Sequence, residues 1–197
     1  AFFEEGLGAD AEAFVQRHDL VGARGEQRVA GVGEHDLDVA VGAALAQRRA
    51  DLQKLKSAIL ARQPEIEAAL RQDFGHRSTY ETAAMEILPL IQGIKYQRRK
   101  LRSWMRPQRR HVPMTFQPAR AWVEYQPLGV VGIMSPWNYP VSLALMPLAT
   151  ALAAGNRAMI KPSEFTPASS ALLVDLLAQT FAPEQVVVLT GDDAVGR

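Results

Sequence analysis

The fold is decided by the stretch GVVGIMSPWNYPVSLALMPLATALAAGNRAMIK, residues 129–161, and by its continuation PSEFTPASSALLVDLLAQTFAPEQVVVL, residues 162–189. Strand-like runs alternate here with helical stretches, in the order 129–134, 141–154, 157–161, 166–181 and 186–189. This order predicts an α/β fold with a partial Rossmann-type parallel sheet, whose ligand site lies at the carboxyl ends of the strands. The first apolar run predicts a strand buried on both faces.

Three helices are predicted ahead of the sheet. The first covers 41–62, where mostly apolar residues recur at alternating spacings of four and three. The second begins at Pro64, which suits a first helical turn, and ends at Gly75. The third begins at Ser78, whose spacing to Glu81 is that of a capping box.

Prolines modify this pattern in two places. Pro89 lies inside the third helix and predicts a kink or a break there. Further on, the segments 112–116 and 119–125 are rich in Val, Thr, Trp and Tyr, with Pro118 between them. They predict two short strands that form a small β-hairpin between the helices and the sheet.

The composition excludes several classes of protein. The chain has 197 residues, 48% of them hydrophobic, with a net charge of +1 and no cysteine. It is therefore expected to be globular. The longest apolar run, 141–154, is interrupted by Pro147 and is too short to span a membrane. Without cysteine these residues form no disulfide and supply no thiol nucleophile, and four scattered histidines lack metal-ligand spacing, so we assign no metal.

Residues 1–40 differ from the rest of the chain. They are rich in glycine and acidic residues, with no period beyond a short helix at 9–16, and we expect them to be disordered or not native. Acidic residues among the first ten exclude a secretory signal, and we expect a cytoplasmic protein. The chain begins at Ala1 and ends at Arg197 just after a strand-like run, which predicts a fragment of a longer protein.

The segment 95–111 is strongly basic. It holds eight lysine or arginine residues and no acidic residue, with Tyr96 and Trp104 interleaved. Such a segment can bind nucleic acid through phosphate contacts and base stacking. Much of it continues the third helix, so we interpret the cations as the solvated face of that helix and keep nucleic-acid binding as the weaker hypothesis.

A first candidate site follows the first predicted strand, in the motif Pro136-Trp137-Asn138-Tyr139-Pro140. Its prolines stiffen the backbone on both sides of Asn138. A rigid amide can donate a hydrogen bond to developing negative charge without reorganising, as an oxyanion site requires. A turn asparagine between packed aromatic rings accounts for the motif equally well.

A second candidate site follows the next strand, in the motif Lys161-Pro162-Ser163-Glu164. A cation and a carboxylate three residues apart can hold the two hydroxyl groups of a ribose from both sides. The alternative is a surface salt bridge in a loop. Because the motif lies at the same predicted sheet edge as Asn138, we favour the binding role.

These motifs, in this order and spacing, resemble the amino-terminal half of the NAD(P)-dependent aldehyde dehydrogenase superfamily. The same pattern includes the segments 126–132 and 153–156. Similarity to the coniferyl-aldehyde dehydrogenase branch, which is close to the class 3 enzymes, is carried by the segments 73–77, 104–105 and 116–120. The resemblance covers roughly 45–196 and leaves 1–40 unmatched.

The resemblance implies a role for each matching residue. Asn138 would donate its amide to the oxyanion of a thiohemiacetal, and Lys161 and Glu164 would hold the adenosine ribose hydroxyls. Glu164 would also repel a 2′-phosphate, which favours NAD as the cofactor, with NADP as the alternative. The residues expected to bind the cofactor are Ile133, Met134, Ser135, Pro136, Trp137, Lys161, Ser163, Glu164 and Gly191.

The resemblance also implies an organisation and an activity. Helices at 41–111 would be followed by bridging strands at 112–126, which pair subunits in this family, and by a partial NAD-binding unit at 127–197. The family's cysteine nucleophile comes later in its members, so the catalytic domain would be absent. We expect a fragment, inactive alone, of a homodimeric enzyme that oxidises an aldehyde, of the aromatic coniferyl type, to the carboxylic acid. The alternative is a non-catalytic module that binds a nucleotide or a partner.

Overall fold

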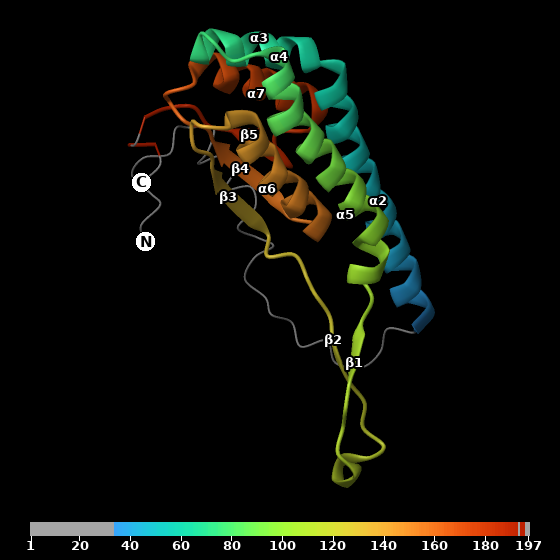
Figure 1. Ribbon diagram of the computed structural model, residues 1–197. Helices are drawn as coiled ribbons and strands as arrows, with labels where there is room; N and C mark the ends of the chain where they lie inside the picture. The colour runs from blue at the N-terminus through green and yellow to red at the C-terminus, as the bar shows by residue number, and fades with distance from the viewer. Residues whose placement is uncertain (1–33, 193, 196–197) are drawn as a thin grey trace.

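The computed structural model of the protein describes residues 34–192 and 194–195, with side chains from Gly42 onward, so the helix expected at 9–16 lies outside the described residues. The described chain begins with a helical region (Figure 1). Its elements are α2 (Glu34–Ala61), α3 (Gln63–Phe74), α4 (Thr79–Thr82), the π-helical turn η1 (Ala83–Ile87) and α5 (Leu88–Trp104).

Helix α2 begins earlier than the sequence predicted. Its first residue is Glu34 rather than residue 41, and the segment 34–40 is therefore helical. Acidic residues are favourable near a helix N-terminus because they interact with the positive end of the helix dipole. The sequence of this segment is acidic, a composition that suits the first turns of a helix.

The predicted boundaries of the next two helices are confirmed. Helix α3 has Pro64 in its first turn and ends at Gly75, which has a φ of 73°. Helix α4 begins after Ser78, whose hydroxyl accepts the backbone N–H of Glu81 at 3.0 Å. The side-chain half of the predicted capping box is therefore present.

Pro89 interrupts the regular helix, as predicted, and the interruption takes the form of η1. A proline ring collides with the carbonyl four residues earlier, here that of Met85, and proline has no N–H to donate to it. The wider turn of η1 spans that carbonyl, and α5 then starts with Pro89 in its first turn. The irregular turn also contains Glu86, which belongs to the candidate functional site.

The second half of the chain forms the predicted parallel sheet. Its elements are β3 (Val130–Met134), α6 (Pro140–Ala154), β4 (Arg157–Lys161), α7 (Pro167–Thr180) and β5 (Val186–Val188). The strands lie in the order β3-β4-β5, and both pairs are parallel. Helix α6 ends at Gly155, which adopts the left-handed conformation with a φ of 84°. The α/β fold class is confirmed.

The sheet is covered by helices on one face. Helices α6 and α7 contact the strands and also both contact α2, so they lie on the same side of the sheet, with the outer helices beyond them. Ile133, Ala158 and Ile160 are buried, and the register of the strands places Ile133 and Ile160 on the same face. Val130 and Met134 alternate with them and are 38% and 66% exposed. The expectation that the run 129–134 is buried on both faces is therefore wrong, because consecutive crossovers of the same hand keep both helices on one side.

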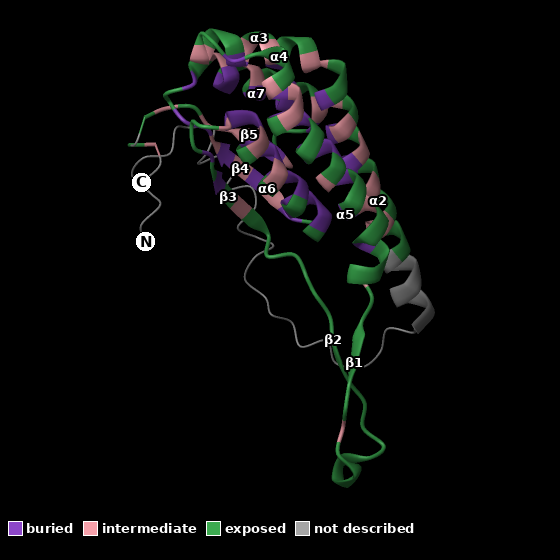
Figure 2. Cartoon of the chain, viewed as in Figure 1, coloured by how far each residue is buried: buried purple, intermediate pink, exposed green. Residues whose placement is uncertain are grey.

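The two predicted hairpin strands are partly misplaced. The observed pair is β1 (Gln108–Arg110) and β2 (Ala121–Val123), which are antiparallel, while the segment 112–116 contains the 3-10 turn η2 (Met114–Phe116). Pro113 and Pro118 cannot donate to a strand ladder, so pairing stops before them. β1 consequently falls inside the region expected to be helical, 41–111. The arm, residues 108–123, projects from the helices (Figure 1) and is exposed along almost its whole length (Figure 2).

Candidate functional site

Both predicted motifs lie at one edge of the sheet. The parallel register places Met134 opposite Lys161 at the carboxyl ends of β3 and β4. The N–H of Ser135 continues this pairing by donating to the carbonyl of Lys161 at 3.0 Å. The loop that carries Asn138 and the loop that carries Glu164 therefore begin side by side, as the alternation of strands and helices predicted.

The Asn138 loop is anchored at its ends and open at its tip. Ser135 is buried, and its hydroxyl donates to the carbonyl of Pro140 at 3.2 Å. Pro136, Trp137 and Asn138 are exposed. The backbone carbonyl of Asn138 accepts a hydrogen bond from the guanidinium of Arg77, so the amide side chain remains available to a ligand.

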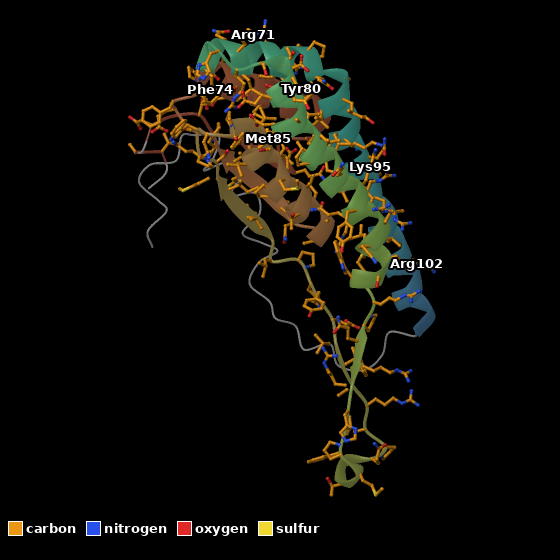
Figure 3. All side chains as sticks on the ribbon, viewed as in Figure 1. Arg71, Phe74, Tyr80, Met85, Lys95 and Arg102 are labelled. Atoms are coloured by element: carbon orange, nitrogen blue, oxygen red, sulfur yellow. The ribbon has the colours of Figure 1, made fainter. Side chains whose placement is uncertain are left out.

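Arg77 connects this loop to the helical region. Its guanidinium lies 3.9 Å from the ring centroid of Phe74 and 5.1 Å from that of Tyr139. Figure 3 labels Phe74 at the end of α3 that faces the strand-end loops. One nitrogen, Nη2, donates to the carbonyl of Asn138 at 2.9 Å, and Nη1 donates to Glu86 at 2.9 Å. Arg77 thus holds the loop through a backbone carbonyl, and the side-chain amide of Asn138 takes no part in this contact.

Glu86 completes this arrangement from η1. Its Oε1 pairs with Arg77, and its Oε2 accepts the backbone N–H groups of Val141 and Ser142, both at 2.9 Å. Glu86 has no exposed surface. Burial raises the pKa of this carboxyl, and the hydrogen bond from Ser142 and the charge of Arg77 oppose that rise.

Sequence reasoning missed Glu86 and assigned no role to Arg77. One signal for Glu86 was present in the sequence, because Glu86 stands beside an apolar stripe at helical spacing that includes Ala84, Ile87 and Leu88. A charged residue in such a stripe is rarely buried without a partner. Arg77 carried no comparable signal, since its partners lie far away in the sequence.

A second carboxylate holds the start of α7. Asp73, at the end of α3, accepts the backbone N–H groups of Ala168 and Ser169 at 2.9 and 2.8 Å. In many dinucleotide-binding sites such helix N-termini bind phosphate. Here the first-turn N–H groups of α6 and of α7 already have carboxylate acceptors. Neither helix N-terminus is therefore free to bind a diphosphate in the usual way.

Lys161 and Glu164 form an ion pair at the end of β4. The Nζ of Lys161 lies 2.7 Å from the Oε2 of Glu164, and Lys161 is the less exposed of the two. The surface salt bridge that the sequence left as an alternative is therefore present. It does not exclude the binding role, because it holds a cation and a carboxylate together beside a cavity.

That cavity has a volume of about 500 Å³ and lies between the first half of α7 and the loops after β4 and β5. Its lining residues are Pro162, Ser163, Glu164, Pro167, Ser170, Ala171, Val174, Thr190 and Gly191. It brings together three residues predicted to bind the cofactor, Ser163, Glu164 and Gly191. The other predicted cofactor residues do not line it: Ile133, Met134, Ser135, Pro136, Trp137 and Lys161. Among these, the side chain of Ile133 is buried.

The basic segment follows the outer side of α5 and continues into the arm. Lys95 and Arg102 are exposed on α5 (Figure 3), and Arg109 and Arg110 are exposed in β1. Arg98 is half-buried and donates to Gln53 of α2 at 2.5 Å. This placement agrees with the interpretation of the cations as a solvated helix face.

Two further properties concern metals and membranes. Within the described residues, three or more histidine or acidic side chains nowhere gather closely enough to bind a metal ion. Among the described helices, none has both the length and the apolar character needed to cross a membrane.

The one-sided parallel sheet, the paired strand-end loops and the adjacent cavity define a partial Rossmann-like α/β unit. A family model, described as the aldehyde dehydrogenase family, matches residues 41–197. The chain therefore belongs to the aldehyde dehydrogenase family, as the resemblance of its motifs predicted.

Known proteins agree with this assignment. The chain is 49% identical over 150 residues to a probable coniferyl aldehyde dehydrogenase of Pseudomonas aeruginosa, covering 76% of this chain and 32% of the relative. The substrate-bound AldH of Staphylococcus aureus aligns with a TM-score of 0.75 and 34% identity, covering 77% and 33% of the two chains. PnpE of Pseudomonas sp. WBC-3, solved in complex with nicotinamide adenine dinucleotide, aligns with a TM-score of 0.63 and 28% identity, covering 80% of this chain and 34% of PnpE. The chain spans about a third of the length of the curated relatives it matches.

Proposed function

We propose that this chain forms the cofactor-side part of an NAD(P)-dependent aldehyde dehydrogenase that converts an aldehyde, of the aromatic coniferyl type, into the carboxylic acid. The observation that carries the proposal is the shared sheet edge, where the Asn138 loop and the Lys161–Glu164 pair begin on neighbouring strands. Similarity to coniferyl aldehyde dehydrogenases supports the substrate class. We also propose that the protein is located in the cytoplasm.

The cavity beside Glu164 suits the adenosine end of a dinucleotide. Its volume of about 500 Å³ is in the usual range for small-molecule sites. Pro167, Ala171 and Val174 offer an apolar wall for a flat ring. Lys161 provides a donor and Glu164 an acceptor for the two ribose hydroxyls. The residues present therefore fit a nicotinamide adenine dinucleotide, which when bound would supply the acceptor for the substrate's hydride.

The charge beside the ribose supports NAD as the preferred cofactor. The carboxylate of Glu164 would repel a phosphate on the ribose 2′-oxygen. Lys161 is close enough to Glu164 to offset part of that repulsion, so NADP is retained as a weaker ligand. Because the helix N-termini of α6 and α7 are occupied by Glu86 and Asp73, we assign the diphosphate to neither of them. The adenosine end is assigned to the cavity, and the residues 133–137 beside Asn138 are retained for the nicotinamide end.

Asn138 is the residue we assign to the aldehyde oxygen. Its exposed amide would donate a hydrogen bond where negative charge develops as the carbonyl is attacked. The attacking thiol cannot come from these 197 residues, since they contain no cysteine. We therefore propose that the chain binds cofactor but does not by itself oxidise aldehydes.

The experiment measures binding and turnover separately on the 197-residue chain. Isothermal calorimetry with NAD, NADP and AMP tests the cavity, and we expect NAD and AMP to bind more tightly than NADP. NADH absorbance with coniferyl aldehyde tests turnover, and we expect none. A folded chain that binds neither NAD nor AMP would refute the cofactor assignment, and NADH formation would refute the assignment of the chemistry to other residues.

A further inference from the structure

Glu86 and Arg77 form a buried ion pair beside the Asn138 loop. A charged side chain without exposed surface is unfavourable unless its partners replace water. Every oxygen of Glu86 has such partners, since Oε1 pairs with Arg77 and Oε2 with the N–H groups of Val141 and Ser142. The apolar stripe around it would accept a leucine more readily, so the charge calls for a further explanation.

Glu86 contacts the segment directly after the Asn138 loop and, through Arg77, the tip of the loop. Through Oε2 it holds the first turn of α6, directly after the loop. Through Arg77 it reaches the carbonyl of Asn138 itself, at the tip. Arg77 is 9% exposed and has its planar group between the rings of Phe74 and Tyr139, so its direction is fixed.

We propose that Arg77 and Glu86 are positioning residues, which hold the backbone of Asn138 so that its exposed amide keeps one direction. The inference rests on the proposed function of Asn138, but it concerns contacts that exist without any ligand. The π-helical turn η1 belongs to the same device, because it carries Glu86 beside the first turn of α6. A regular helix would place the following residues at a different angle.

A merely stabilising ion pair makes a different prediction from a positioning pair. Exchange of both residues for neutral ones, Arg77→Met with Glu86→Gln, removes the buried charges together and keeps an amide oxygen for α6. If the pair only stabilises the fold, the double variant recovers both the thermal stability and the order at Asn138 that Arg77→Met loses. If it positions Asn138, the double variant recovers stability but not the hydrogen bond to the Asn138 carbonyl.

The test is nitrogen-15 relaxation of the 197-residue chain, read at the backbone and side-chain amides of Asn138, with Tm measured on the same samples. We expect the backbone order parameter to fall from about 0.85, typical of rigid backbone, to below about 0.6 in Arg77→Met. The double variant should regain Tm without regaining order. An unchanged order parameter in Arg77→Met, or one fully restored in the double variant, would overturn the proposal.

Two further variants secure the result. Arg62→Met removes another interhelical arginine, which pairs with Glu65 and with Asp175 of α7, and it should lower Tm while leaving Asn138 ordered. If Arg77→Met does not fold, Arg77→Lys replaces it. Lysine keeps the charge but cannot donate to Glu86 and Asn138 in the same fork geometry, so the loss of order should persist. NAD binding by the unaltered chain is measured separately, so a failure of the cofactor assignment leaves this test intact.

Discussion

Glu86 accepts the backbone N–H of Val141 at 2.9 Å, although the two residues are 55 positions apart in the sequence. This contact joins a π-helical turn of the outer helices to the first turn of a helix that covers the sheet. Glu86→Ala would leave Arg77 buried without its partner and two N–H groups without an acceptor. We expect the free energy of unfolding to fall by about 3–5 kcal/mol, as for other broken buried pairs. Urea denaturation measures it, and a loss below about 1 kcal/mol would contradict the assigned role.

The same carboxyl predicts a pH dependence. Burial raises the pKa of Glu86 in the folded chain above its ordinary value of 4.5. A raised pKa means that the folded state binds the proton more tightly than the unfolded state. The stability contributed by the protonated group is therefore complete below pH 4.5 and is lost as pH rises through the folded pKa.

The variant Glu86→Gln cannot titrate at this position and provides the reference. We expect the stability of the unaltered chain, relative to Glu86→Gln, to decline from below pH 4.5 toward neutral pH. Urea denaturation of both chains across that range supplies the difference. A relative stability that rises with pH would show that Arg77 and the α6 N–H groups outweigh the effect of burial.

Two glycines with positive φ provide a matched comparison. Gly75 and Gly155 end α3 and α6 with φ angles of 73° and 84°. A Cβ at Gly75 would meet no atom within 4 Å, whereas at Gly155 it would lie 2.6 Å from the guanidinium of Arg48. Gly75→Ala should lose about 1–2 kcal/mol of stability from backbone strain alone. Gly155→Ala should lose more, because Arg48 must also move; equal losses in thermal unfolding would contradict this.

The Lys161–Glu164 pair predicts a change in cofactor preference. Glu164→Gln removes the charge that repels a 2′-phosphate but keeps a group that can hydrogen-bond the ribose. We expect calorimetry to show weaker NAD binding, by roughly tenfold for the loss of about 1.5 kcal/mol from a charged hydrogen bond. NADP binding should weaken less or improve. Lys95→Met, on the outer side of α5, is the control and should change neither affinity; a parallel loss for both cofactors in Glu164→Gln would argue against the repulsion.

The arm predicts a dimer contact. Met114, Phe116 and Trp122 expose large apolar side chains there, and such patches mark protein–protein contacts. We expect the chain to self-associate, and Phe116→Ser with Trp122→Ser to raise the dimer dissociation constant by roughly thirtyfold or more, the effect of losing about 2 kcal/mol. Sedimentation equilibrium measures the constant. Tyr80→Ser, an exposed aromatic of α4, is the control; an unaltered chain that remains monomeric at high concentration would remove the arm from this role.

Local patterns predicted most of the fold because they depend on near neighbours. Pro64 and Gly75 bound α3 through backbone geometry that each residue imposes by itself. The strand 157–161 was predicted with its observed bounds, since its apolar centre, 158–160, stands between the turn residues Gly155 and Pro162. The burial of β3 was not predictable in this way, because it depends on which side of the sheet α6 and α7 occupy.

The same distinction between local and distant contacts separates the site residues that were predicted from those that were not. Asn138 and Glu164 were found because each follows a strand, and the ends of parallel strands meet at one edge. Arg77 and Glu86 were not found, because their partners lie 61 and 55 residues away. In the hairpin a local pattern was misleading. The strand-forming residues at 112–116 predicted a strand, but Pro113 and Pro118 limit the pairing to residues outside them.

The contacts of Asp73 and Glu86 affect how the protein folds during its synthesis. Each accepts hydrogen bonds from a helix start that lies 95 and 55 residues later in the chain, respectively. During synthesis from the N-terminus, the outer helices leave the ribosome well before the residues that these carboxylates hold. Domains fold largely as units, and contacts between distant residues form slowly. We therefore expect the outer helices to gain these contacts only after the sheet has been synthesised. A growing chain that ends at the arm would leave both carboxylates without these N–H partners.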